Sequence, residues 1–394
     1  MRIRAYEPRF EDELLAFRRR VFAEFPYKGD RACFEWEFDR NPLGSSLPIH
    51  LLLLERMGDR IVGQISALRD RLLVAGEWRE CLWLYDLIID PAFRGGPAVL
   101  ALFRREMASA PIVLTTGPRP GTRRVCEVLG WTRLDVTHAM YCVLRPTRLA
   151  ALAEANDGSD VGAAAEGRRH GESRLAGLRH AALRLALPVA DRVVPSVARL
   201  FTGAARAAAS GRGARVERID RFDAAWDADF DRLTRRCGVT VYRTAAILNW
   251  RFVERPIGRY ELFVLRAPGG ALRGSVVLKW MARPSVARWM EVADYLVDPD
   301  DVAGFRSLVR AALLAAGTAG VDFVRFRLSR PEHRALLRAP LWIEHTRPVT
   351  DEVFTYSRDA ALVEALRSSP WHLTALAGDR LEPGRDEWKA PAAT

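Results

Sequence analysis

The sequence predicts an α/β protein that contains two copies of one globular domain, because three motifs repeat in the same order. The first motif, W-x-F-x3-P-x-G, begins at Trp36 and recurs 214 residues later at Trp250. Each copy leads into an apolar run that is interrupted by a glycine. A D-x3-D-P motif then follows, beginning at Asp86 in one copy and at Asp294 in the other. The spacing between copies is far longer than the period of a solenoid, so the repeat indicates a duplicated domain.

The length and composition agree with two domains. The chain has 394 residues, of which 49% are apolar, and this is enough material for two separate cores. The predicted divisions are a first domain over 1–147, an alanine- and arginine-rich, partly helical linker over 148–215, a second domain over 216–380 and a polar tail over 381–394.

Residue periodicity and turn signals predict the elements of the first domain in order. Apolar residues at helical spacing between Leu14 and Phe22 indicate the first helix, and the second helix ends before Pro42 because proline disfavours helical backbone in the preceding residue. Gly58 marks a turn between two strands, and Gly130 closes the last helix. The predicted elements are a strand at 2–5, helices at 10–25 and 33–38, strands at 49–55, 61–68 and 79–89, a helix at 96–108, a strand at 112–116, a helix at 122–129 and strands within 132–143.

The domain pattern resumes at Val216, after a segment with a different composition. Leucines at helical spacing over 175–187 predict a basic helix in that segment. We interpret it as a linker helix packed across the domains, with a membrane or carrier-protein contact as the alternative. The elements predicted for the second domain are a helix at 226–236, strands at 261–265, 272–280 and 287–297, a helix at 302–315, a strand at 321–328, a helix at 332–338 and a strand at 352–356. The segment 245–252 carries the repeated tryptophan.

Charge and cysteine usage limit the class of protein. The net charge is +11, but 57 of the 60 basic residues are arginines scattered through both halves, which is typical of a GC-rich genome rather than of a nucleic-acid surface. The five cysteines form no C-x-x-C pair, which indicates a reducing compartment and no metal site. Without a leader or an apolar stretch of membrane-spanning length, the sequence predicts a cytoplasmic protein.

A glycine loop between a strand and a helix is the first feature that indicates chemistry. The strand that ends at Ile89 continues into Pro91-Ala-Phe-Arg94-Gly95-Gly96-Pro-Ala and then into the helix predicted at 96–108. Exposed backbone amides at a helix N-terminus bind pyrophosphate readily, and Arg94 can add a charge-assisted contact. The dinucleotide pattern G-x-G-x-x-G and the P-loop pattern are both missing, so we interpret the loop as a simple phosphate cradle.

At these residues the chain resembles the GNAT superfamily of acyl-CoA-dependent N-acyltransferases. The segment from Pro91 to Ala98 is similar to the family signature x-P-x-x-R-G-x-G-x-[GA] with one residue deleted, and 122–131 is similar to its N-x2-A-x2-[LF]-Y-E-K-L-G-F helix. The resemblance covers 1–145 and recurs more faintly over 216–357. It implies two GNAT-like domains, each with a mixed, largely antiparallel central sheet flanked by helices.

In this family the loop amides bind the pyrophosphate of CoA, and the strand before the loop pairs with pantetheine. The resemblance therefore implies acetyl-CoA or another acyl-CoA as co-substrate, without a metal. The cofactor-binding residues that it implies are Leu87, Ile88, Ile89, Arg94, Gly95, Gly96, Pro97 and Ala98.

The resemblance also nominates an acid and substrate contacts. Cys126 stands where the family often has the tyrosine that protonates the leaving thiolate, although a small buried helix residue is the alternative role. Tyr85 or Tyr141 is the substitute acid. Arg119 occupies the family's asparagine position, and we assign Arg119 and Tyr141 as substrate contacts.

Asp86 is the candidate general base. It lies among apolar residues in the strand before the loop, and a carboxylate in apolar surroundings holds its proton more readily, as suits a base that works near neutral pH. Asp294 occupies the matching place in the second copy, which lacks the R-G-x-G loop and carries acids there instead. A shared structural role is therefore the alternative, and we expect CoA to bind the first domain only, with the second forming part of an acceptor cleft or a scaffold.

The leading hypothesis is an N-acyltransferase that moves an acyl group from acyl-CoA, in the first instance acetyl-CoA, to an amine of a small molecule or a sugar. One alternative keeps the fold and changes the donor to an acyl carrier protein or an aminoacyl-tRNA. The other is a non-catalytic binding or scaffold protein, suggested by the missing tyrosine and the shortened loop.

Overall fold

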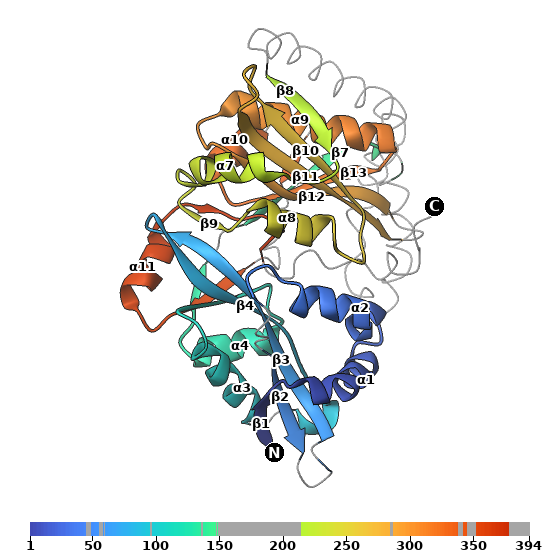
Figure 1. The fold of residues 1–394 in the computed structure, drawn as a ribbon, viewed down its shortest axis with the longest axis vertical. Coiled ribbons are helices and arrows are strands. Elements are labelled where there is room, and N and C mark those ends of the chain that lie inside the picture. Colours follow the sequence, from blue (N-terminus) through green and yellow to red (C-terminus); the bar gives the residue numbers. More distant parts are fainter. Residues whose placement is uncertain are drawn as a thin grey trace, which may run out of the picture.

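The computed structural model contains two mixed β-sheets flanked by helices (Figure 1). The predicted linker helix, Gly95, Gly96 and the polar tail lie outside the residues that the structure describes. The described residues are 1–44, 49–54, 58, 60–94, 97–134, 137–146, 148, 214–283, 287–337, 342–344 and 352–377.

The first sheet is mixed and largely antiparallel. Only β4 and β5 pair in parallel along its main strand order. Two short strands, β9 (Val239–Val241) and β16 (Trp371–His372), extend this sheet at the far end of β3. The main order is β1 (Arg2–Ala5), β2 (Ile49–Leu54), β3 (Arg60–Val74), β4 (Glu77–Ile89), β5 (Ile112–Thr116), β15 (Val353–Tyr356) and β6 (Thr132–Leu134).

The second sheet repeats this arrangement, again with one parallel pair, β12 with β13. Two mixed sheets flanked by helices confirm the predicted fold class. The order of the second sheet is β14 (Trp342–Glu344), β7 (His138–Val143), β13 (Phe323–Leu328), β12 (Ala287–Val297), β11 (Leu272–Arg283), β10 (Tyr260–Arg266) and β8 (Arg215–Ile219).

Helices cover both faces of each sheet because each helix buries one apolar stripe. On the first sheet, α1 and α2 bury residues such as Phe17 and Phe34 on one face, whereas α3 and α4 bury Phe103 and Cys126 on the other. On the second sheet, α9 covers one face, and α7 and α8 pack into the cluster on the opposite face. The helices are α1 (Glu11–Val21), α2 (Arg31–Phe34), α3 (Ala98–Met107), α4 (Pro120–Val128), α7 (Ala224–Thr234), α8 (Ala245–Phe252), α9 (Val302–Ala319), α10 (Pro331–Leu337) and α11 (Ala360–Ser368), with short helical turns at Pro8–Phe10, Pro26–Gly29, Glu35–Asp39 and Pro91–Phe93.

The two sheets exchange strands. β7, from the first half of the sequence, lies between β13 and β14 of the second sheet. β15, from the second half, lies between β5 and β6 of the first sheet. The periodicity of these strands does not reveal the sheet they join, and neither sheet is therefore built from one predicted domain range alone. No element was predicted at β9, β14, β16 or α11; the three strands have only two or three residues each.

The repeated tryptophans face each other where the two halves meet. The rings of Trp36 and Trp250 stack at 5.2 Å between centroids and 25° between planes. The indole Nε1 of Trp36 donates to the carbonyl oxygen of Trp250 at 2.7 Å, and Nε1 of Trp250 donates to that of Trp36 at 2.8 Å. This reciprocal pair joins the two copies in one core cluster that draws residues from both sheets.

The repeated glycines are required by close packing of the strands. A Cβ built on Gly63 would lie 3.2 Å from Ile89 and from Leu52. On Gly274 it would lie 2.4 Å from the carbonyl oxygen of Leu296. Both contacts are with the strands next in the sheet, so any side chain would force the strands apart.

One described helix, α9, is long and apolar enough to cross a membrane by length and composition, with a mean hydropathy of 1.2 over its 18 residues. The sequence prediction had recognised no such stretch. In the structure one face of α9 packs on the second sheet through Phe305, Leu308 and Ala312.

Candidate functional site

A gap opens between β4 and β5, the two parallel strands of the first sheet. Their pairing ends at Leu84 and Thr115, where Oγ1 of Thr115 donates to the carbonyl of Leu84 at 3.2 Å. Beyond Leu84, β4 pairs only with β3 among the described residues. The other edge of β4 over 87–89 therefore offers backbone groups that no described strand pairs with.

A bulge at Asp86 produces this gap. Ser66 faces Tyr85 but Gln64 faces Ile88, so two residues of β4 stand opposite one residue of β3. Asp86 has a φ of 48°, a left-handed backbone conformation that is strained for a residue with a side chain. Such conformations persist where surrounding contacts hold them.

Two buried cations hold the side chain of Asp86. Nη2 of Arg18 lies 2.8 Å from one carboxylate oxygen, and Nζ of Lys28 lies 3.0 Å from the other. All three side chains are less than 5% exposed. Nε2 of Gln64 donates to the backbone carbonyl of Asp86 at 3.2 Å. The prediction that Asp86 has apolar surroundings is therefore wrong. The helical segments that carry Arg18 and Lys28 supply charged partners, which the sequence of the strand does not reveal.

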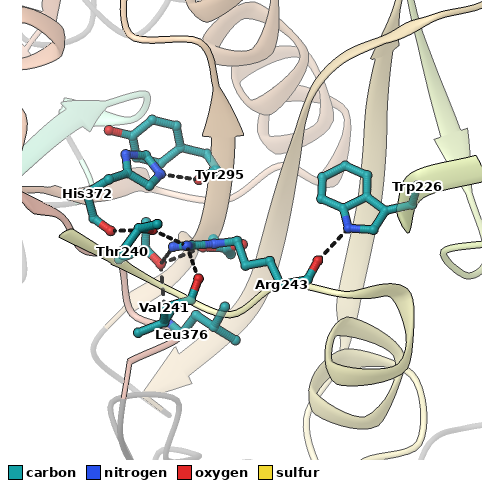
Figure 2. Close-up of polar contacts among 9 residues, drawn as sticks. Trp226, Thr240, Val241, Arg243, Tyr295, His372 and Leu376 are labelled. Carbon is teal, nitrogen blue, oxygen red and sulfur yellow. Dashed lines mark hydrogen bonds and ion pairs between the residues drawn. The ribbon is translucent and has the colours of Figure 1, made fainter. Parts of the chain in front are cut away.

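The second half contains the same ion pair. Nε of Arg243 lies 3.1 Å from the carboxylate of Asp294, which also accepts a bond from Oγ1 of Thr374 at 2.5 Å (Figure 2). Arg243 stands seven residues before Trp250, and Lys28 stands eight residues before Trp36. The duplicated unit thus includes a buried cation and its aspartate.

β4 leads directly to the N-terminus of α3. Pro91–Phe93 forms a helical turn, and α3 begins at Ala98 after Pro97, with no side chain capping it among the described residues. Arg94 is exposed, and its Nε donates to the carbonyl of Ile89 at 3.0 Å. The free edge of β4, an exposed guanidinium and an uncapped helix N-terminus therefore follow one another along the chain.

In the second half the corresponding places are filled. β12 and β13 pair only as far as Val292 and Phe326, which leaves the same opening. The chain crosses that opening at His372 and Leu373. Nε2 of His372 donates to the carbonyl of Tyr295 at 2.7 Å (Figure 2). The amide of Leu373 donates to Oγ of Ser329 at 2.8 Å. Burial lowers the pKa of His372 well below its usual value, so the ring is neutral.

The N-terminus of α9 is also occupied. Oδ1 of Asp301 accepts from the amide of Gly304 at 2.8 Å and caps the helix. Arg273 binds the same carboxylate at 2.6 Å. A capping carboxylate stands where a phosphate would need to approach, so the second half offers no free anion site at this helix.

The other predicted site residues are placed as follows. Tyr85 is buried beside Phe38, burial raises its pKa well above the usual value, and its hydroxyl has no hydrogen-bond partner among the described residues. Cys126 is fully buried on the inner face of α4, and burial raises its pKa to about 12. Arg119 is exposed at the start of α4.

Tyr141 lies on the second sheet, where its ring contacts Phe323 at 5.7 Å. The structure brings Tyr85, Asp86, the β4 edge and Arg94 together along one strand, whereas Tyr141 belongs to the other sheet. The sequence analysis missed three residues of this site, Arg18, Lys28 and Glu37. Oε2 of Glu37 lies 3.6 Å from Nη2 of Arg18. The available signal was that Lys28 and Arg243 occupy similar positions before the repeated tryptophans.

No family model and no curated protein matches this sequence. Many solved structures do resemble it, among them the following. A GCN5-related N-acetyltransferase from Anabaena variabilis ATCC 29413 matches with a TM-score of 0.58 and 10% identity, over 92% of this chain and 74% of that one. The chain has the GNAT fold. A conserved protein of unknown function from Enterococcus faecalis V583, described as a probable N-acyltransferase, matches with a TM-score of 0.53 and 11% identity. The match covers 90% of this chain and 71% of that one.

N-myristoyltransferase of Saccharomyces cerevisiae, with myristoyl-CoA bound, matches with a TM-score of 0.50 and 12% identity. The match covers 90% of this chain and 78% of that one. The GNAT fold thus extends over both halves of the chain. In the first sheet no described residue crosses the gap beside β4, whereas the chain itself crosses the corresponding gap of the second sheet.

Proposed function

We propose that the protein is an N-acyltransferase that takes its acyl group from acyl-CoA bound to the first sheet. The observation that carries this is the continuous series of a free β4 edge, Arg94 and the uncapped N-terminus of α3. Pantetheine amides would pair with the edge at Leu87, Ile88 and Ile89. The pyrophosphate would lie at Gly95, Gly96, Pro97 and Ala98, where the helix dipole and Arg94 favour negative charge.

In the proposed reaction an amine nitrogen attacks the thioester carbon, the carbon–nitrogen bond forms and the carbon–sulfur bond breaks. Backbone amides of β4 would polarise the carbonyl, which is the main source of catalysis together with positioning. The leaving thiolate needs a proton or a hydrogen bond. Tyr85 supports this role better than Cys126, because its buried phenol stays protonated and lacks a partner, whereas the Cys126 thiol faces the core.

The acceptor proposed is a small-molecule amine, including an amino sugar, and acetyl-CoA is the first donor to test. An acyl carrier protein or an aminoacyl-tRNA remains the alternative donor, and binding without catalysis the alternative function. The five free cysteines, all buried, fit the proposed cytoplasmic location.

Asp86 has two proposed roles that make different predictions. As a general base it would accept the proton of the amine, and Asp86→Asn would lower kcat by about 100- to 10,000-fold. As a positioning residue it would hold the bulge through Arg18 and Lys28, and its replacement would mainly cost stability.

Asp294→Asn is the matched control, because Asp294 is an equally buried aspartate with a similar cation but lies at the filled opening. Release of free CoA thiol from acetyl-CoA, measured over a panel of amines, gives kcat, and thermal unfolding gives stability. A large loss of kcat in Asp86→Asn, with a stability loss equal to that of Asp294→Asn, supports the base. Retained kcat in folded Asp86→Asn rules the base out.

A further inference from the structure

The second sheet carries a cavity that the proposed acyl-CoA site does not use. It has a volume of about 810 Å³ and is lined by residues of β8, β10, β11 and α9. This volume is within the range of sites that hold a small-molecule ligand. Its apolar wall is formed by Val216, Phe263, Trp280, Leu314 and several alanines of α9.

Four arginines line the same cavity, against one acid. Arg215 and Arg218 come from β8, Arg259 precedes β10, and Arg310 comes from α9. The acid, Glu261, accepts a hydrogen bond from Nε1 of Trp280 at 3.0 Å, and its other carboxylate oxygen lies 3.9 Å from Nη1 of Arg218. The lining therefore carries an excess of positive charge next to an apolar surface.

The indole of Trp280 connects the charged and apolar parts. The guanidinium of Arg259 lies 4.4 Å from its ring centre, so one face of the ring is already covered by a cation. Helix α9 adds an apolar side with little cover, since only a third of it is buried and Leu314 is 42% exposed. An exposed apolar wall beside clustered cations is complementary to a ligand that has an apolar body and an anionic head.

We propose that this cavity binds a single-chain amphiphile with an anionic head group, the chain lying along α9 and Trp280 and the head between the arginines. This site is separate from the proposed acyl-CoA site, because it lies on the second sheet, where the helix N-terminus and the strand opening are occupied. A free anionic amphiphile and a lipid of a membrane surface share this chemistry.

Dodecyl phosphate, used below its micelle concentration, is the probe. Isothermal titration of the full chain, in the absence of CoA, is expected to give one saturable site with micromolar affinity. Dodecanol and dodecyl maltoside, which carry no charge, are expected to bind at least about tenfold more weakly. Arg94→Glu should leave the binding unchanged, so a failure of the proposed acyltransferase function would not affect this result.

Arg259→Glu should weaken dodecyl phosphate at least about tenfold, and Arg218→Glu, at an exposed arginine of the same cavity, should also weaken it. Arg306→Glu is the matched control, since Arg306 is exposed on α9 but does not line the cavity. No saturable binding, equal binding of dodecanol, or equal losses in Arg259→Glu and Arg306→Glu would overturn the proposal.

Co-sedimentation with phosphatidylcholine vesicles containing phosphatidic acid separates the two sources. Sedimentation that is lost in Arg259→Glu and in Leu314→Asp, together with dodecyl phosphate binding, identifies a membrane lipid. Binding of dodecyl phosphate without sedimentation identifies a free ligand.

Discussion

The reciprocal pair of Trp36 and Trp250 gives a prediction about how the two halves are joined. Trp36→Phe keeps an aromatic ring but removes the indole N–H, which now donates to the carbonyl of Trp250 at 2.7 Å. A net hydrogen bond contributes about 1 kcal/mol, and a buried carbonyl left without a donor costs about 1–3 kcal/mol. Both residues are less than 5% exposed, so water does not replace the lost donor freely. We expect Trp36→Phe to lower the free energy of unfolding by about 1–3 kcal/mol.

The control is Trp131→Phe. Trp131 is also buried and packs on Phe103 at 5.8 Å, but its indole nitrogen has no partner among the described residues. The variant Trp131→Phe therefore measures the stability lost with the ring area alone. Urea unfolding followed by far-ultraviolet circular dichroism gives the free energies.

The loss of unfolding free energy in the double variant of Trp36→Phe and Trp250→Phe should differ from the sum of the losses in the single variants by about 0.5 kcal/mol or more. The reason is that the two residues are in direct contact. Combining Trp36→Phe with Trp131→Phe should be additive, because the two tryptophans belong to different core clusters. The reciprocal hydrogen bonds do not stabilise the protein if two results are found together. These are a loss of unfolding free energy in Trp36→Phe no larger than in Trp131→Phe, and additive losses in the Trp36 and Trp250 variants.

Two further predictions concern buried titrating groups. Burial raises the pKa of Asp70 from 3.8 to about 6, so the folded state holds a proton that the unfolded state has lost, and stability should fall as the pH rises from about 4 to about 6. Urea midpoints should show this loss in the native chain relative to Asp70→Asn, and parallel pH profiles would contradict it. Burial also raises the pKa of the Cys126 thiol to about 12, and all five cysteines are buried, so Ellman's reagent at pH 8 should label no thiol quickly in the folded chain and five in urea. Rapid labelling of a thiol in the native state would show that it is accessible.

The sequence predicted much of the local structure because the signals for it are local. The repeated W-x-F block was interpreted as the mark of a duplicated domain, and the structure places Trp36 and Trp250 in contact in the core cluster that both sheets share. The strand at 112–116 has the predicted bounds. Periodicity and turn residues determine such elements, so one sequence suffices to find them.

The exchange of β7 and β15 could not be predicted, because alternation shows that a segment is a strand but not which sheet edge it joins. The partners of Asp86 were missed for a similar reason. Arg18 lies in a run of three arginines on α1, which resembles a solvated helix face, yet it is fully buried. Only the packing of α1 across β4 shows that this arginine meets Asp86 68 residues away.

We propose that the protein has one anion-binding site for CoA and that this site lies on the first sheet. Isothermal titration of the full chain with CoA tests this most directly, with Arg94→Glu as the variant and Arg306→Glu, an exposed arginine just inside α9, as the matched charge reversal in the second half. The account predicts one CoA per chain, an affinity at least about tenfold weaker in Arg94→Glu and an unchanged affinity in Arg306→Glu. Two CoA molecules per chain, equal losses in both variants, or no binding of CoA would contradict it.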